Sequence, residues 1–353
     1  MVESENMVAS PRKVPDPPVG VIESLTAGFE TVASHVGLIL LPAALDLFLW
    51  LGPRLSINPI MQKLIDLLNS VPAPDAASAA NQKTTVEFFK AIGEGTNVFN
   101  LLSTAPLGVP SMMAGQLPDA LPGGRPVVLL LNNELLFLIL ALACLLLGLL
   151  LGAAYFSLIG SLLRDPKPTP VEVARRIIVN WAKLAAFGIL FVILAFFISV
   201  PFVLAVGLLQ VLASALLSAV AGGGLAALLI GLAVTVWNAV LLWILLYAAF
   251  ALHGMVLKDR GVFGAIWDSA RLVQWNLMSA MGLFIVIFLI NWGLGYVWSL
   301  PKPDSWLTLA GIGGHAFVST GLVAATFVFY KDRYRWWIEM REWLLATAAK
   351  KGS

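Results

Sequence analysis

The longest uncharged stretch of this chain constrains its fold more than any other feature. From Leu184 to Leu257 there are 74 residues without a single Asp, Glu, Lys or Arg. The rest of the chain follows the same trend, because 59% of the 353 residues are apolar and 12% are charged, about half of the usual ~25% in soluble domains. This composition excludes a water-soluble globular fold and predicts an all-α, polytopic membrane protein.

A transmembrane helix needs ~20 apolar residues to cross ~30 Å of hydrocarbon, and this length predicts six spans. The uncharged stretch has room for two, three or four crossings. Basic segments lie on both sides of it and are typical of the cytoplasmic face, so we expect an even number, and two is the simplest. The predicted spans are Ala33–Leu51, Leu135–Leu162, Leu184–Val206, Leu225–Val256, Leu277–Trp298 and Trp306–Phe329.

Two features divide the uncharged stretch further. Pro201 predicts a kink or a break in the third span, and the three glycines at 222–224 predict a turn. The surplus residues, about Gly207 to Ala221, are expected to form an extracytoplasmic extension or an interfacial helix.

The distribution of basic residues predicts that both termini are cytoplasmic. In that orientation the inner segments hold 16 Lys and Arg and the outer segments hold 6, as the positive-inside rule requires. We therefore expect a multi-pass protein of the bacterial cytoplasmic membrane. Its predicted parts are a disordered cytoplasmic tail (1–20), a six-span membrane domain (21–330) with an outer loop (52–133), and a cytoplasmic amphipathic C-terminal helix (331–353).

Amphipathic patterns outside the spans predict interfacial helices. In the outer loop, Asn58 followed by Pro59 indicates a helix start, Thr84 and Glu87 have capping-box spacing, and a third short helix is expected near Val98. On the inner side, apolar stripes precede the third and fifth spans, so we expect three helical hairpins, each entered through an amphipathic elbow. The stripes are Val171, Ala174, Ile178 and Trp181, and Phe263, Ile266, Trp267, Ala270 and Val273.

Four polar residues fall within or at the outer ends of the predicted spans. They are Asp46, Glu134, Asn291 and His315. Polar groups in hydrocarbon are costly and often functional. If the four converge, they form a polar pocket open to the outside that could bind a cation, a proton or a headgroup. The alternative is a set of separate hydrogen bonds between helices.

The sequence offers no pattern for catalysis or for a cofactor. It lacks a phosphate-binding glycine loop and a nucleophile elbow, and its three histidines lie in different spans without zinc spacing. A single cysteine, Cys144, excludes an internal disulfide. The near-neutral charge gives no reason to expect nucleic-acid binding. We therefore expect no enzyme activity, no catalytic residues, no metal and no cofactor.

Two segments carry a resemblance to known membrane proteins. The stretch GVFGAIWDSARLVQWNLMSAMGLFIVIFL (Gly261–Leu289) resembles an element of multi-span bacterial families, including the membrane domain of some glycerophosphodiester phosphodiesterases. There the elbow has the form A-x-x-x-S-x-x-L-V, which matches Ala265, Ser269, Leu272 and Val273, followed here by Trp275 and Asn276. The stretch LLPAALDLFLWLGPRLSI (Leu40–Ile57) resembles the first span of uncharacterised six-span proteins of filamentous and thermophilic bacteria.

The resemblance implies a six-span topology but no activity, because this sequence has no phosphodiesterase catalytic domain to which catalytic residues could be transferred. The leading hypothesis is a non-enzymatic scaffold or accessory subunit of a membrane assembly, with the lipid bilayer and other membrane proteins as partners. The alternative is a transporter, or a protein that handles lipids or small molecules, with the outward polar pocket as its site.

Overall fold

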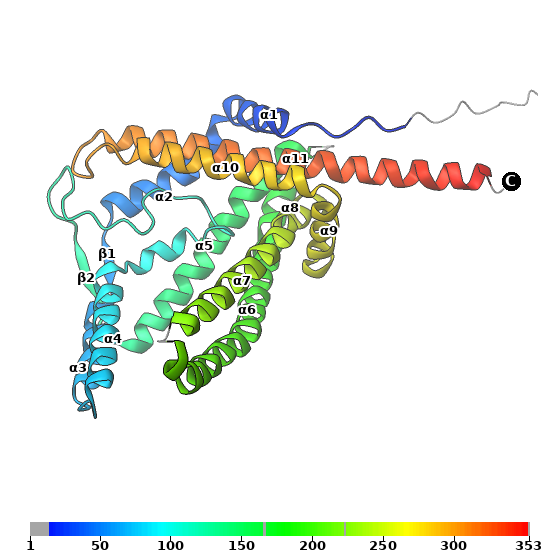
Figure 1. The fold of residues 1–353 in the computed structure, drawn as a ribbon. Helices are drawn as coiled ribbons and strands as arrows, with labels where there is room; N and C mark the ends of the chain where they lie inside the picture. The colour runs from blue at the N-terminus through cyan, green and yellow to red at the C-terminus, as the bar shows by residue number, and fades with distance from the viewer. Residues whose placement is uncertain (1–13, 165–166, 222–223, 352–353) are drawn as a thin grey trace, which may run out of the picture.

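The computed structural model describes residues 14–164, 167–221 and 224–351 and is almost wholly helical (Figure 1). Residues 1–13 of the expected tail therefore lie outside the described part. The longer helices are α1 (Val21–Ser34), α2 (Leu40–Leu51), α3 (Asn58–Asn69), α4 (Ala76–Gly95), α5 (Glu134–Leu163), α6 (Pro170–Ala221), α7 (Gly224–Ala248), α8 (Ala251–Lys258), α9 (Val262–Trp275), α10 (Leu277–Trp298) and α11 (Thr308–Lys351).

The short elements all lie in the first part of the chain. Two 3-10 helices are η1 (Val36–Ile39) and η2 (Val98–Leu102). Two strands, β1 (Arg54–Ser56) and β2 (Val128–Leu130), pair in parallel with Leu55 opposite Leu129. This strand pair, which the sequence patterns did not predict, joins the two ends of the 52–133 segment.

Five helices are long and apolar enough to cross a membrane, and the number rises to six if one bent pair forms a single span. This agrees with an all-α, polytopic membrane protein. The five are Glu134–Leu163, Pro170–Leu212, Ala227–Lys258, Leu277–Trp298 and Thr308–Ala348, and the bent pair joins Val21–Ser34 to Val36–Leu51 at an angle of 94°.

The first span differs from the straight helix that was predicted over Ala33–Leu51. The chain bends at His35, and the twelve residues of α2 rise only ~18 Å. Both ends of the bent pair are tied to the last part of the chain. The Val19 amide donates a hydrogen bond to Asp332 (2.7 Å), and the Trp50 indole donates one to the carbonyl of Pro303 (2.9 Å). The predicted span therefore begins at a sharp bend after α1, and the elbow expected before it stays a prediction.

Close approach of α1 to α11 depends on Gly28. A Cβ atom at this position would overlap the backbone of Ala325 and Gly321. Phe29 then packs on Phe317, with ring centroids 5.9 Å apart. Small residues that let helix backbones come together are typical of membrane helix interfaces.

The uncharged stretch contains two crossings, α6 and α7, as the charge pattern predicted. However, α6 is one continuous helix from Pro170 to Ala221, so the expected elbow and the surplus residues after Val206 both belong to it. Pro201 lies inside this helix without ending it. The expected turn at 222–223 lies outside the described residues. In the same way, the C-terminal segment continues the last span as part of α11 rather than forming a separate helix.

The helix is interrupted between α7 and α8, and the Ser269 side chain of α9 forms hydrogen bonds with the backbone groups at this interruption. The Ser269 hydroxyl accepts a hydrogen bond from the Phe250 amide (3.0 Å) and donates one to the Tyr247 carbonyl (2.6 Å). Backbone groups freed by a break in lipid need such partners. Ser269 belongs to the elbow motif that carries the resemblance described above.

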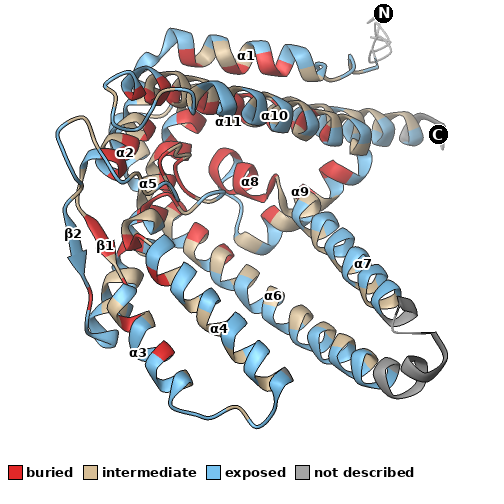
Figure 2. Cartoon of the chain, turned by 60° about the vertical axis from the view of Figure 1, so that its left-hand side comes forward, coloured by how far each residue is buried: buried red, intermediate tan, exposed pale blue. Residues whose placement is uncertain are grey.

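The core surrounds α8 and the middle of α11 (Figure 2). Every residue from Ala251 to Leu257 is buried. Phe250 stacks on Phe329 at 5.4 Å, and the His253 ring lies 4.4 Å from that of Phe327. In contrast, α6 and α7 extend away from this core as a hairpin (Figure 1).

Residues 52–133 begin and end at one end of the helices, which we call the loop end, and Leu101 and Leu107 of this segment reach the middle of α5 at Gly148 and Gly152. Here α3 begins at Asn58 with Pro59 in its first turn, as predicted, and η2 is the third short helix. The predicted capping box was wrong, because α4 begins at Ala76 and its N-cap, Asp75, accepts a hydrogen bond from the Ser78 amide (2.7 Å). We call the opposite end, where α5 and α8 end and α6 begins, the basic end.

Candidate functional site

A buried carboxylate at the loop end is the most elaborate polar site that the predicted residues form. Asp46 of α2 is fully buried. Three groups of the loop after η2 bind its side chain: the Ser111 hydroxyl donates to Oδ1, the Met112 amide donates to Oδ2 (3.1 Å), and the Met113 amide donates to Oδ1 (3.0 Å). The Ser111 hydroxyl in turn accepts a hydrogen bond from the Ala114 amide (2.9 Å).

His315 of α11 completes the site. Its Nδ1 lies 3.4 Å from Oδ2 of Asp46, which is within ion-pair distance when the imidazole is protonated. The contact lacks hydrogen-bond geometry. Asp46 therefore connects three parts of the chain that are distant in sequence, namely α2, the loop at 111–114, and α11.

Tryptophans cover this end of the bundle. Trp50 packs edge-on against Trp306, with centroids 6.0 Å apart. Gly314, next to His315, faces the ring of Trp298, where a side chain would collide. The glycine thus serves packing, as expected for small residues in the last span.

The other two predicted site residues lie elsewhere. Glu134, at the start of α5, is exposed and forms an ion pair with Lys63 of α3 (2.8 Å). Asn291 is exposed on α10. The structure brings Asp46 and His315 together, whereas Glu134 contacts Lys63 and Asn291 is exposed. Of the two alternatives that the sequence left open, this arrangement favours separate polar contacts over one four-residue pocket.

The contacts of Asp46 join α2, the loop at 111–114 and α11, so their role is structural, and we call Asp46 with these partners the latch. An ionised carboxylate offers about four acceptor positions, and Ser111, two amides and His315 occupy its two oxygens. Sequence reasoning missed the loop at 111–114, because two of its three donors are backbone amides that carry no residue-type signal.

A second carboxylate lies at the basic end. Asp259, which caps the end of α8 with a left-handed backbone (φ 54°), binds Arg164 at the end of α5 (2.9 Å) and Arg176 of α6 (2.8 Å). Partial burial would raise the pKa of Asp259, but the two guanidinium groups outweigh it and hold the pKa below its usual value. This cluster fastens the ends of three helices.

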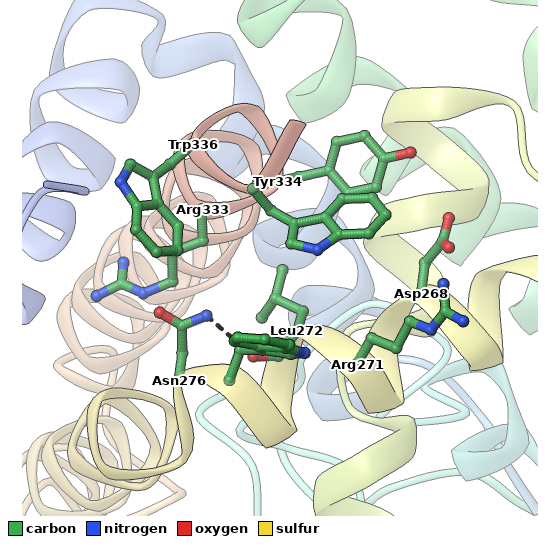
Figure 3. Close-up of a pocket in the computed structure, with 9 residues that line it drawn as sticks. Asp268, Arg271, Leu272, Asn276, Arg333, Tyr334 and Trp336 are labelled. Carbon is green, nitrogen blue, oxygen red and sulfur yellow. Dashed lines mark hydrogen bonds between the residues drawn. The ribbon is translucent and has the colours of Figure 1, made fainter. Parts of the chain in front are cut away.

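A buried arginine, Arg333, lies where α11 faces α9 (Figure 3). Arg333 is 3% exposed, and its guanidinium lies 3.4 Å from the centre of the Phe329 ring. Within the described part of the chain, its Nε and Nη1 atoms have no hydrogen-bond partner. The adjoining cavity, about 20 Å³ in volume, has room for about one water molecule and is too small for an organic substrate.

The described residues hold no group of three or more His, Cys, Asp or Glu side chains that could bind a metal ion. Comparison of the chain with protein-family models, with curated proteins and with solved structures found no match. The resemblance to phosphodiesterase membrane domains therefore stays a prediction. The structure and the composition together describe an integral membrane protein.

Proposed function

We propose that this chain is a non-enzymatic scaffold or accessory subunit of a membrane assembly, and that its α6–α7 hairpin docks a helix of another membrane protein. The main support is that α11 is largely buried within the chain, whereas α6 and α7 are not. In the most apolar part of α11, 56% of the residues are buried within the chain, whereas the share is 0% in α6 and 0% in α7. The hairpin therefore offers most of its membrane surface to something else.

One face of α7 is built for close helix packing. Small residues recur every fourth position along it, and an amide lies between them: Ala227, Gly231, Thr235, Asn238 and Ala239. All five are exposed. At 100° per residue they occupy one face. The opposite face holds Trp237, which stacks on Phe202 of α6 at 4.3 Å.

Lipid alone explains this face less well than a partner helix does. Lipid tails solvate large apolar side chains as well as a protein can, so a lipid-facing surface has no need of small residues. A small-residue stripe instead lets a second backbone approach. Asn238 is a polar group in the middle of an apolar helix. Its amide donates one hydrogen bond to the Val234 carbonyl within α7 (2.8 Å), and its remaining capacity suits a hydrogen bond across a helix interface.

The alternative function, transport through an outward polar pocket, has weaker support. Of its four residues, Asp46 is buried and accepts three hydrogen bonds from the loop at 111–114, and Glu134 forms an ion pair with Lys63. A latch of this kind supports a rigid scaffold more than a substrate pathway.

The test is the content of the native particle, extracted in mild detergent and weighed by mass spectrometry. We expect a stoichiometric second protein. The variant G231L/T235L should lower its recovery about tenfold, since such interfaces are worth ~1–2 kcal/mol. A Cβ at Gly231 meets nothing within 4 Å in this chain, so the fold itself should tolerate the change.

The matched control is Gly207→Leu on α6, where a Cβ also meets nothing within 4 Å. This variant should keep the partner. A particle that holds only this chain, or partner recovery that G231L/T235L leaves unchanged, would refute the docking role of α7.

A further inference from the structure

A large cavity opens at the basic end. Its volume is about 580 Å³, enough for a lipid headgroup and far larger than the gap beside Arg333. Its lining residues come from the ends of α5 and α8, from the start of α6 and from the side of α11. Six basic side chains line it: Arg164, Lys167, Arg176, Lys258, Lys331 and Arg335.

Basic side chains outnumber acidic ones in the lining of this cavity. Three carboxylates line it beside the six cations, namely Glu172, Glu339 and Glu342. Two more carboxylates pair with its arginines: Asp259 with Arg164 and Arg176, and Asp332 with Arg335 at 3.0 Å. A lining so rich in basic groups favours an anionic headgroup.

The remaining lining is apolar and points to a lipid rather than to a soluble anion. Leu163, Leu257 and Ile338 line the same cavity. A second hollow of about 320 Å³ adjoins it and shares Leu163, Lys331 and Arg335. This second hollow extends along α1 and α11 past Ala27 and Val328. Its lining combines charged groups, such as Glu23 and Asp332, with an apolar part formed by Val19, Ala27, Leu163 and Val328. A headgroup in the first cavity thus has an apolar surface beside it for an acyl chain.

The position of the cavity relative to the bilayer also suits an anionic headgroup. The cavity lies at the end of the apolar helices, where headgroups are found, and the charge distribution predicts that this end is cytoplasmic. Basic pockets between membrane helices on that side are suited to anionic headgroups. We propose that this cavity binds the phosphodiester headgroup of an anionic phospholipid.

The geometry gives the lipid a structural consequence. Arg164, Arg176 and Lys258 come from three different helices that Asp259 and its neighbours already hold together. A phosphate among them adds charge-assisted hydrogen bonds to this junction. The bound lipid therefore stabilises the folded protein. This proposal does not depend on the partner-docking role of α7.

The experiment titrates the purified full chain with phosphatidylglycerol and, separately, with zwitterionic phosphatidylcholine, using native mass spectrometry and the thermal unfolding midpoint. We expect one tightly held phosphatidylglycerol per chain and a raised midpoint, with little effect of phosphatidylcholine. Equal binding of the two lipids would overturn the proposal.

Variants locate the site. K167Q/K258Q should weaken phosphatidylglycerol binding about 30-fold, because each lysine near an anionic headgroup contributes about a factor of five. The control K83Q/K90Q removes the same charge from two exposed lysines of α4 at the loop end and should bind like the unaltered chain. If K167Q/K258Q does not fold, Lys167→Glu alone replaces it, since Lys167 is an exposed residue of a connecting segment. Unchanged binding by the cavity variants would overturn the assignment.

A soluble probe separates the two sources of phosphate. Glycerophosphoglycerol carries the same phosphodiester headgroup without acyl chains, and we expect it to bind at least 100-fold more weakly than the lipid because it buries no acyl chain against the apolar part of the second hollow. If it binds as tightly as phosphatidylglycerol, the cavity is a site for a soluble phosphate and the lipid assignment is wrong.

Discussion

Asp46 at the loop end and Asp259 at the basic end both bind partners from distant parts of the chain, but their surroundings differ. Asp46 is fully buried and accepts hydrogen bonds from one hydroxyl and two amides, with His315 beside it. The side chain of Asp259 is 51% exposed and pairs with two arginines. Water can replace the partners of Asp259, whereas nothing can replace those of Asp46. We therefore expect the same chemical change to have very different effects at the two ends.

The largest effect should come from Asp46→Ala. This change leaves the Ser111 hydroxyl, two amides and His315 without their acceptor, and removing one member of such a buried charged cluster typically costs about 3–5 kcal/mol. Tryptophan fluorescence in detergent would follow the thermal unfolding. The control is Asp304→Ala, an exposed residue of the same end, which should unfold like the unaltered chain. An unchanged midpoint for Asp46→Ala would show that the latch does not support the fold.

A smaller effect is expected for Ser111→Ala. The hydroxyl of Ser111 donates to Asp46 and accepts from the Ala114 amide, and hydrogen bonds to charged groups are worth about 1.5–3 kcal/mol. The matched control is Ser299→Ala, whose exposed hydroxyl bonds only the nearby Tyr296 carbonyl (2.8 Å). Equal destabilisation by the two alanines would contradict the special role of the loop at 111–114.

The smallest effect is expected for Asp259→Asn, because exposed ion pairs contribute about 0–1 kcal/mol. The pKa of Asp259 is lowered in the folded protein, so its stabilisation is present above the ordinary carboxyl pKa of about 3.9 and is lost as the pH falls through the lower folded pKa. Unfolding midpoints measured across this acidic range should converge for Asp259→Asn and the unaltered chain. A difference that persists at the lowest pH would argue against the ion pair as its cause.

The sequence predicted the helical membrane fold well because hydropathy, helix length and loop charge are local properties. It did not indicate which side chains join one helix to another. On α9, Phe263 and Trp267 of the predicted apolar stripe are 76% and 59% exposed, whereas Ala265 and Ser269 are fully buried. The reason is that these helices are surrounded by lipid and not by water. In lipid the large apolar side chains can face outward at no cost, and the small ones form the protein interface.

The candidate site, too, could be predicted from the sequence only in part. Asp46 and His315 could be chosen from the sequence, because ionisable groups in apolar helices are costly and need partners. Their mutual contact could not be predicted, and neither could the separation of Glu134 and Asn291, because no local pattern relates residues so far apart. The four elbow residues Ala265, Ser269, Leu272 and Val273 are all buried on α9, and of these only Val273 belongs to the predicted apolar stripe.

The sequence by itself determined that this chain crosses a membrane, where its main crossings lie, and which end carries its basic residues. The tertiary structure alone decided that α1 and α2 meet at a bend of 94°, that Ser269 bonds the backbone at the break before α8, and that two loop amides bind Asp46. The physical reason is that hydropathy drives helices into lipid but does not pair them. Pairing depends on shape and on hydrogen bonds between distant residues, which exist only once the chain is folded.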